Sequence, residues 1–202
     1  MPDSKPPVTL SDRARALFSG VTQRAGALMV RLGIHPDTIT LLGLLVVAIG
    51  AYFISTGALQ LGGILLVISL PLDALDGATA RAMKRTSQFG GILDSTLDRY
   101  ADGLIFGGFI LYFSRLGDET GILLSLASLV GSFVVSYVRA RSGEAGLSVK
   151  IGWFSRFERV VVLLLALLIP PLLWIGLWVL AVGTNITSVQ RIWYVFKHLK
   201  EA

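Results

Sequence analysis

Long apolar runs separated by short breaks dominate this chain. No charged residue occurs between Asp37 and Asp73, and small residues at 55–57 divide that stretch into two runs of membrane length. Four further apolar runs follow, each bounded by charged residues, glycine or proline. The six predicted spans cover residues 38–56, 58–82, 88–115, 120–139, 155–170 and 172–191. This pattern predicts an all-α membrane protein with six transmembrane helices.

The segment before the first span has a different pattern. Residues 11–32 mix apolar residues with arginines at helical spacing, which predicts an amphipathic helix lying in the headgroup plane. We expect this helix to brace the membrane domain, and the Pro-rich residues 1–10 to form an extended start. The expected organisation is an N-terminal tail and interfacial helix over residues 1–36, followed by a membrane domain over residues 37–202.

The composition narrows the class of protein. Of the 202 residues, 53% are hydrophobic and the mean hydropathy is +0.71, which is too apolar for an ordinary soluble domain. The absence of cysteine excludes disulfides and thiolate metal ligands. The net charge of +5 comes from basic residues beside apolar runs, so anionic headgroups and phosphorylated substrates are the expected partners, and nucleic acid is not.

The distribution of Lys and Arg predicts the orientation. The turns after the first and fifth spans carry no charge, and the turn after the third carries Arg115 as its only base. Nearly all other basic residues fall on the opposite side. The positive-inside rule therefore places both termini and that side of the membrane domain in the cytoplasm, which requires an even number of spans.

Four carboxylates stand at the cytoplasmic ends of the second and third spans. Asp73 and Asp76 are three residues apart, and Asp94 and Asp98 are four apart, so each pair shares one face of a helix. A short turn near residues 84–88 would bring the pairs together. Converging carboxylates repel one another unless cations lie between them, and oxygen ligands suit Mg²⁺ or Mn²⁺. The alternative is a set of charges solvated at helix ends.

The residues around these acids carry a family resemblance. The pattern D-x2-D-G-x2-A-R-x8-G-x3-D-x3-D is met in full, and it resembles the signature of the CDP-alcohol phosphotransferases, integral membrane enzymes of phospholipid synthesis. Its fixed positions are Asp73, Asp76, Gly77, Ala80, Arg81, Gly90, Asp94 and Asp98. The resemblance implies two Mg²⁺ or Mn²⁺ ions held by Asp73, Asp76 and Asp94, with Asp98 either shared between them or free.

The same resemblance implies further roles. Asp98, at the far end of its pair, is the candidate general base on the acceptor hydroxyl. The residues implied for the nucleotide and its phosphates are Asp37, Thr40, Gly77, Ala80, Arg81 and Gly90. Asp37 has an alternative as a simple helix cap. Asp102 continues the face of Asp94 and Asp98 by one turn, and it either tunes the metals or completes a polar network.

Basic residues gather at the same predicted depth as the carboxylates. They lie at the ends of the fourth, fifth and sixth spans: Ser136 with Arg139, Arg156 with Arg159, and Arg191. We call these residues the basic lobe. A basic lobe beside metal-binding carboxylates suits an enzyme that holds a phosphorylated acceptor against a metal-bound pyrophosphate. Taken singly, each arginine has an alternative as an ordinary positive-inside anchor.

Longer stretches of the sequence resemble one group of enzymes within this family. FGGILDSTLDRYADGLIFGG, VSYVRAR, RFERVVV and VQR are similar to the phosphatidylinositol-phosphate synthases within that family. The similarity implies a homodimer in which Ser136 and the four arginines bind the phosphate of inositol 1-phosphate. Arg139 stands where Lys is frequent, and Phe157 where Pro is frequent, which leaves the acceptor open. Arg99, where glycerol-phosphate enzymes usually have Lys, counts against that acceptor.

The predicted function is transfer of a phosphatidyl group from CDP-diacylglycerol to a hydroxyl of a phosphorylated polyol, with release of CMP. Inositol 1-phosphate is the favoured acceptor, and glycerol 3-phosphate or free inositol are the alternatives. A divalent-cation transporter is the alternative from another class, since clustered carboxylates also select cations. A transporter of this kind should have acidic residues near the bilayer midplane and two chain halves that repeat the same helical pattern. The sequence shows neither feature.

Overall fold

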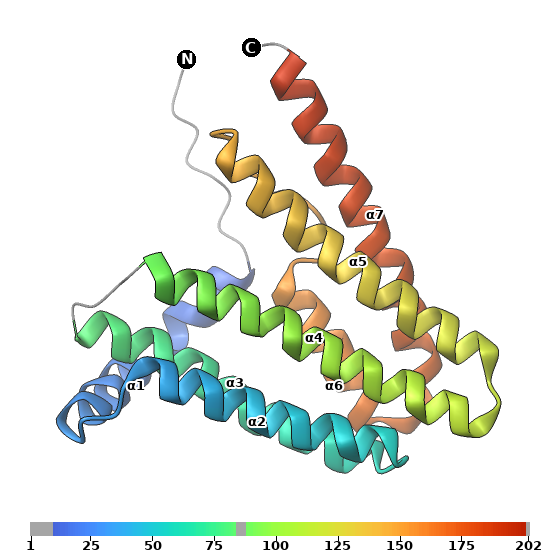
Figure 1. Ribbon diagram of the computed structural model, residues 1–202, viewed down its shortest axis with the longest axis horizontal. Coiled ribbons are helices and arrows are strands. Elements are labelled where there is room, and N and C mark those ends of the chain that lie inside the picture. Colours follow the sequence, from blue (N-terminus) through green and yellow to red (C-terminus); the bar gives the residue numbers. More distant parts are fainter. Residues whose placement is uncertain (1–9, 84–87, 201–202) are drawn as a thin grey trace.

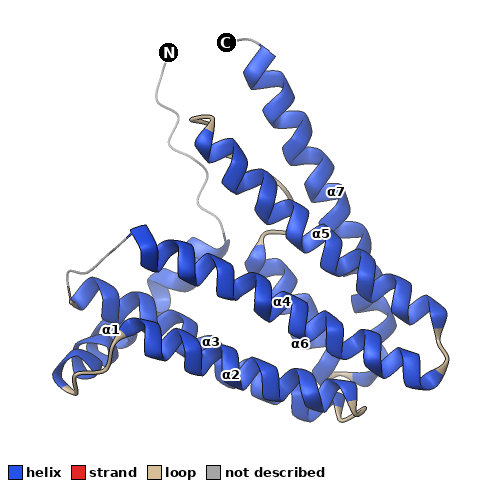
Figure 2. Ribbon diagram, viewed as in Figure 1, coloured by secondary structure: helices blue, strands red, loops and turns tan. Residues whose placement is uncertain are grey.

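The computed structural model describes residues 10–83 and 88–200, and every regular element within those ranges is helical (Figures 1 and 2). The helices are α1 Leu10–Arg31, α2 Pro36–Ser55, α3 Leu59–Ala82, α4 Gln88–Leu116, α5 Glu119–Glu144, α6 Arg156–Leu168, the 3₁₀ helix η1 Pro170–Leu172 and α7 Leu173–Lys200. The all-α prediction is confirmed. Residues 1–9 of the extended start predicted at 1–10, and residues 84–87 of the turn predicted at 84–88, lie outside the described residues, whereas Leu10 begins α1 and Gln88 begins α4.

Four helical segments have the length and composition of membrane spans. They are α2, α3, α5 and the segment Pro170–Leu199, which joins η1 to most of α7. Two of the six predicted spans do not meet this criterion. Helix α4 has 29 residues, but its first half carries the acids, and α6 has 13 residues, about 20 Å of helix against roughly 30 Å of hydrocarbon.

Glycine and proline set the helix boundaries that the sequence predicted. Gly33 follows α1 with φ +71°, and Pro36 opens α2 behind His35, whose ring accepts a hydrogen bond from the Asp37 amide. The break at residues 170–171 is also present, as η1. Helix α5 differs, because it continues past the predicted end at residue 139 to Glu144, and a chain reversal at Gly146 (φ +77°) follows.

Helices α2 to α7 close into a ring in the order α2, α3, α6, α7, α5, α4, in which each helix packs against the next and α4 returns to α2 (Figure 1). In this order α4 and α6 are not neighbours but lie across the ring from each other. Helix α1 packs outside the ring against α3, and the contact is close: a Cβ on Gly26 would lie 2.8 Å from the Ala78 carbonyl carbon.

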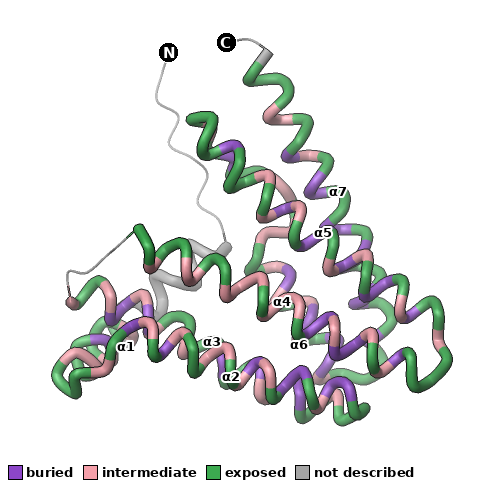
Figure 3. The backbone as a smooth tube through the Cα atoms, viewed as in Figure 1, coloured by how far each residue is buried: buried purple, intermediate pink, exposed green. Residues whose placement is uncertain are grey.

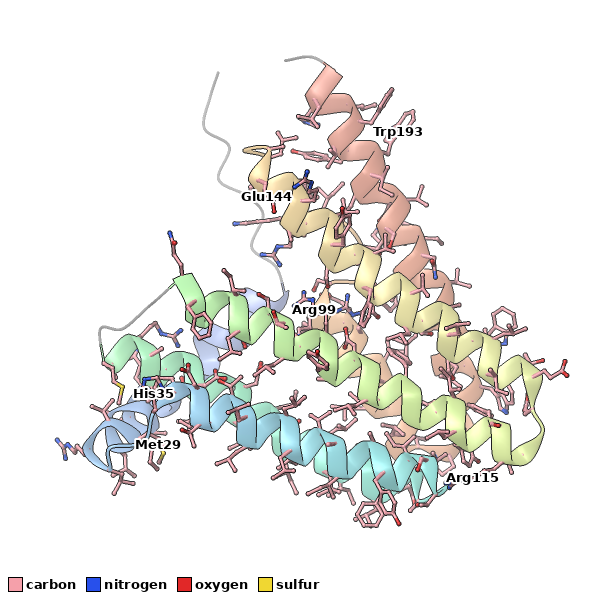
Figure 4. All side chains as sticks on the ribbon, in the orientation of Figure 1. Met29, His35, Arg99, Arg115, Glu144 and Trp193 are labelled. Carbon is pink, nitrogen blue, oxygen red and sulfur yellow. The ribbon has the colours of Figure 1, made fainter. Side chains whose placement is uncertain are left out.

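An apolar core fills one half of the ring. Phe109 and Phe113 of α4 are buried among residues of α2, α6 and α7, including Ile54, Leu167 and Leu177. Figure 3 colours the buried positions along these helices purple. This half lies toward the end of α4 that carries Arg115, and the junction of α1 and α2 at His35 lies at the other end (Figure 4). The charged residues of α3, α4 and α6 therefore occupy the half of the ring that the apolar core does not fill.

Two adjacent glycines of α4 give a test of this packing. A Cβ on Gly108 would lie 2.6 Å from the Ala51 carbonyl oxygen of α2, whereas a Cβ on Gly107 would meet no atom within 4 Å. Gly108→Ala is expected to separate α2 from α4 and to destabilise the protein by about 1–3 kcal/mol. Gly107→Ala is the matched control and should be neutral or slightly stabilising. Equal thermal unfolding temperatures in detergent for the two variants would contradict this close contact.

Candidate functional site

Three carboxylates from two helices converge at the polar half of the ring. Asp73 and Asp76 come from the last three turns of α3, and Asp94 comes from the second turn of α4. One carboxylate oxygen from each lies within 4.8 Å of the other two. The sequence predicted that the acid pairs of the two helices meet. In the structure Asp73, Asp76 and Asp94 lie together.

The three acids fit a divalent ion. At an effective dielectric constant of about 20, two carboxylates 4.8 Å apart repel by roughly 3 kcal/mol, and a bound cation removes this cost. Bonds of about 2.1 Å to Mg²⁺ place opposite ligand oxygens about 4.2 Å apart, so small side-chain movements suffice for joint coordination. All three donors are hard oxygens, the ligand type that Mg²⁺ and Mn²⁺ prefer.

Asp76 is held in place by two donors. Its side chain is buried, with 7% of the residue exposed. The Thr40 hydroxyl on α2 donates to Asp76 Oδ2 at 2.8 Å, and the Gly77 amide donates to Asp76 Oδ1. The resemblance implied that Thr40 helps hold the nucleotide. In the structure Thr40 orients a carboxylate of the cluster, an outer contact of the kind that tunes metal sites.

Thr40→Val tests this contact, because valine keeps the shape of threonine and removes the donor. We expect the affinity for Mn²⁺ to fall about tenfold or more, the usual cost of losing such an outer partner. Thr38→Val is the control, since Thr38 is exposed on the same turn. Titration with Mn²⁺, followed by electron paramagnetic resonance, gives the affinity. A loss of equal size in both variants would contradict the role of Thr40.

Asp98 lies at the border between the acids and the basic residues. It is outside the group of three whose oxygens lie within 4.8 Å of one another. Its Oδ2 is 2.6 Å from Arg156 Nη1 and 3.7 Å from Arg99 Nη1, and the same Arg156 nitrogen is 3.5 Å from Asp73. Arg156, predicted to bind the acceptor phosphate, therefore links the acids of α3 and α4 to α6.

The residues implied for the nucleotide surround the acids. Gly77, Ala80 and Arg81 follow Asp76 on α3, and a Cβ on Gly77 would lie 3.3 Å from Arg81 Nη1, so the guanidinium lies beside the bare backbone. Gly90 is in the first turn of α4. Asp37 opens α2 one turn before Thr40, and its carboxylate lies 3.3 Å from His35 Nδ1.

The basic residues also gather, from three helices. Arg159 and Arg139 lie within electrostatic reach of Arg191, and Arg156 within reach of Arg159. Arg139 is exposed and Ser136 is half-buried near the end of α5. The predicted basic lobe is therefore present as a group of side chains from α5, α6 and α7.

Arg191 has structural contacts that the sequence did not indicate. It is buried, and its Nη1 donates to the Val135 carbonyl at 2.7 Å while Nε donates to the Ile151 carbonyl at 3.0 Å. The loop that carries Ile151 passes close to α7 at Gly152, where φ is +114° and a Cβ would lie 2.4 Å from Thr187 Cγ2. Arg191 therefore ties α7 to α5 and to this loop at the edge of the basic lobe.

The structure contains two ionic contacts that the sequence did not predict. Arg99 pairs with Asp98, and Asp102 pairs with Arg159 at 3.5 Å. The four-residue spacing of Asp94, Asp98 and Asp102 was a visible signal that α4 carries an acidic stripe. The partner on α6 was not visible, because nothing in the local sequence says that α6 faces α4 across the ring.

A surface groove lies away from the carboxylates. It has a volume of about 530 Å³ between the ends of α5 and α7, where its lining includes Tyr137, Arg141 and Leu199. Neither the carboxylates nor Arg156 and Arg159 line it. The chemistry of the converging side chains, and not the size of a hollow, identifies the candidate site.

Comparison with known proteins gives matches over most of the chain. The family model described as CDP-alcohol phosphatidyltransferase matches residues 33–189. A phosphatidylinositol phosphate synthase from Streptomyces avermitilis is 40% identical over 207 residues, covering 96% of this chain and 85% of that protein. An archaetidylinositol phosphate synthase from Pyrococcus horikoshii is 36% identical over 179 residues, covering 88% of this chain and 92% of that protein.

Solved structures agree with this likeness. A crystal structure of Mycobacterium tuberculosis phosphatidylinositol phosphate synthase with CDP-DAG bound has a TM-score of 0.83 at 33% identity, covering 87% of this chain and 94% of that one. A structure of the same enzyme in complex with manganese and citrate has a TM-score of 0.82 at 34% identity, covering 87% and 88%. The family-model match over residues 33–189 includes the carboxylates of α3 and α4 and the arginines of α5 and α6, and Arg191 lies two residues beyond it.

Proposed function

This chain belongs to the CDP-alcohol phosphatidyltransferase family, and from that premise we propose that it transfers the phosphatidyl group of CDP-diacylglycerol to a hydroxyl of inositol 1-phosphate, releasing CMP. It is an integral membrane transferase of phospholipid synthesis that uses a divalent metal. One observation carries the choice of a phosphorylated acceptor: the convergent carboxylates of α3 and α4 face the arginines of α6 across the ring, joined at Arg156.

The carboxylates hold the metal in this proposal. Bound Mg²⁺ or Mn²⁺, two ions in our proposal, supplies the charge that polarises the pyrophosphate and stabilises the departing CMP. Asp73, Asp76 and Asp94 bind the ions, Asp98 reaches them from one turn further along α4, and Thr40 keeps Asp76 oriented. Asp98 also accepts the proton of the attacking hydroxyl, because it lies between the acids and the arginines that would hold the acceptor.

The remaining polar residues bind the two substrates. We assign the nucleotide and its phosphates to Asp37, Thr40, Gly77, Ala80, Arg81 and Gly90. We assign the acceptor phosphate to Ser136, Arg139, Arg156, Arg159 and Arg191. The guanidinium groups present planar forks that match phosphate oxygens. Because Arg191 donates to two backbone carbonyls, we expect it to support the phosphate site from its edge.

All six ring helices cross the membrane in this proposal, including α4 and α6. The closed ring supports it, because the charged ends of α4 and α6 contact protein in place of lipid. Residues 1–36 form the tail and interfacial helix, and residues 37–202 the membrane domain. The clustering of basic residues supports cytoplasmic termini and a cytoplasmic site, where lipid tails stay in the bilayer while soluble acceptor enters. We also propose that the chain forms a homodimer.

A direct assay distinguishes inositol 1-phosphate from the other candidate acceptors. Purified protein in nanodiscs receives labelled CDP-diacylglycerol with inositol 1-phosphate, inositol, glycerol 3-phosphate or serine, and CMP release is measured. We expect turnover with inositol 1-phosphate, dependent on Mg²⁺ or Mn²⁺ and abolished by a chelator. Turnover with glycerol 3-phosphate alone would overturn the proposed acceptor. Flux of Mn²⁺ into proteoliposomes without CMP release would favour the transporter alternative.

A further inference from the structure

Two ionic contacts bridge the interior of the ring between α4 and α6. Arg156 Nη1 lies 2.6 Å from Asp98 Oδ2, and Arg159 Nη2 lies 3.5 Å from Asp102 Oδ2. The spacings match, since the acids are four residues apart on α4 and the arginines three apart on α6, each one helical turn. Helices α4 and α6 are not neighbours in the ring, and these two contacts join their charged halves, whereas Phe109 and Leu167 belong to the shared apolar core at the other end.

Asp102 is too far from the carboxylate cluster to bind the same ions. Eight residues separate it from Asp94, which corresponds to about 12 Å along the helix axis. A carboxylate that binds Mg²⁺ or Mn²⁺ lies about 2.1 Å from the ion, so an ion held by Asp73, Asp76 and Asp94 would lie beyond the reach of Asp102. Asp102 must therefore act through another residue, and the residue that it contacts is Arg159.

The Asp102–Arg159 contact is the more enclosed of the two. The Arg159 side chain is 7% exposed and that of Asp102 21%, whereas the Arg156 side chain is 43% exposed. A buried arginine stays charged, so its burial is costly without a partner, and the contact at Nη2 with Asp102 restrains where the guanidinium lies. The charges of Arg156 and Arg99 also face Asp102, so this acid is the counter-charge for several bases at once.

We propose that Asp102 is a positioning residue for the acceptor: by holding Arg159 across the ring, it aims the remaining donors of that guanidinium at the acceptor phosphate and sets the separation between the basic lobe and the carboxylates. The inference rests on the proposed function, because it requires a phosphorylated acceptor. It assigns to Asp102 a role in acceptor binding and none in holding the metal.

The test compares Asp102→Asn with the wild-type chain in the CMP-release assay. We expect the KM for inositol 1-phosphate to rise about tenfold or more, since small misplacements of a positioning group carry such costs. The KM for CDP-diacylglycerol and the affinity for Mn²⁺ should stay within about twofold, because the inference gives Asp102 no role in binding either of them. Adding Asp102→Asn to Arg159→Gln should raise the acceptor KM no further, because the two residues act as one unit.

Asp118→Asn is the structural control. Asp118 caps α5 at the other end of the ring, where its Oδ1 accepts the Gly121 amide at 2.9 Å. This variant should lower the unfolding temperature without changing the acceptor KM. If Asp102→Asn behaves in the same way, Asp102 is only a brace and the inference fails. A loss of Mn²⁺ affinity in Asp102→Asn would also overturn it, because the acid would then belong to the metal site.

The same measurements also cover a variant that does not fold, and they distinguish failure of the proposed function from failure of the role of Asp102. If Asp102→Asn does not fold, Asp102→Glu decides: it keeps the charge but displaces the carboxylate, and an unchanged acceptor KM would overturn the inference. If the wild-type chain transfers to no phosphorylated acceptor, the proposed function fails. If it does transfer and Asp102→Asn leaves the acceptor KM unchanged, only the role of Asp102 fails.

Discussion

Asp76→Asn is expected to abolish phosphatidyl transfer and the binding of Mn²⁺ together. Asp76 is the buried member of the cluster and accepts hydrogen bonds from Thr40 and the Gly77 amide, so the amide of asparagine would replace a charged ligand at a position that two donors hold. Metal ions contribute several kcal/mol of transition-state stabilisation, and losing about 4 kcal/mol lowers kcat roughly a thousandfold. CMP release and Mn²⁺ titration of the same preparation measure the two effects.

Asp118→Asn again supplies the matched control, since it makes the same chemical change at the opposite end of the ring. It should leave both turnover and Mn²⁺ affinity near those of the wild-type chain. If Asp76→Asn lost turnover but bound Mn²⁺ normally, Asp76 would serve the nucleotide and not the metal. If it kept turnover, the cluster of three would not be the catalytic metal site.

The carboxylate cluster was predictable because its geometry is local. Spacings of three and four residues put Asp73 with Asp76, and Asp94 with Asp98, on single helical faces. One short connection between α3 and α4 leaves little freedom for where those faces meet. The helix boundaries at Gly33, Pro36 and residues 170–171 were predictable for a similar reason, since a left-handed glycine, a proline at the first helical position and two adjacent prolines each favour a helix end or start. A single proline is not decisive, because Pro71 lies inside α3.

The contacts that couple distant helices were not predictable. The hydrogen bond from Thr40 to Asp76 and the ionic contacts of Arg156 and Arg159 depend on the order of helices around the ring. Hydrophobic periodicity gives each helix an interior face but does not say which helix it faces. The resemblance supplied residue types at positions, and so it placed Arg191 among the phosphate ligands without revealing that two of its nitrogens donate to backbone carbonyls.

The number of membrane spans was also not fully predictable from the sequence. Sequence runs near α4 and α6 were long enough to predict helices, yet only four helical segments in the described residues have the length and composition of membrane spans. Helix α6 falls short because it has 13 residues, and α4 because the first half of its 29 residues carries charged side chains, two of which face α6. Charge in a membrane helix lowers its hydropathy, and here that charge is the chemistry of the site.

Asp98→Asn is expected to separate catalysis from metal binding. Asp98 lies outside the three-acid group and contacts Arg156 at 2.6 Å, so its place suits a base on the acceptor hydroxyl better than a principal metal ligand. Removing a general base costs about 10²–10⁴ in kcat. We therefore expect a loss of that size, with the KM for CDP-diacylglycerol and the Mn²⁺ affinity changed by no more than about threefold.

The contrast between Asp98→Asn and Asp76→Asn decides between the two roles that the resemblance gives to Asp98. If it is mainly a ligand, the two variants lose Mn²⁺ binding alike, and excess metal restores part of the turnover in both. If it is mainly the base, excess metal restores nothing in Asp98→Asn, because the bound ions are already in place and the hydroxyl proton has no acceptor. The contact with Arg156 favours the second outcome, since the arginine that would hold the acceptor then lies beside the group that deprotonates it.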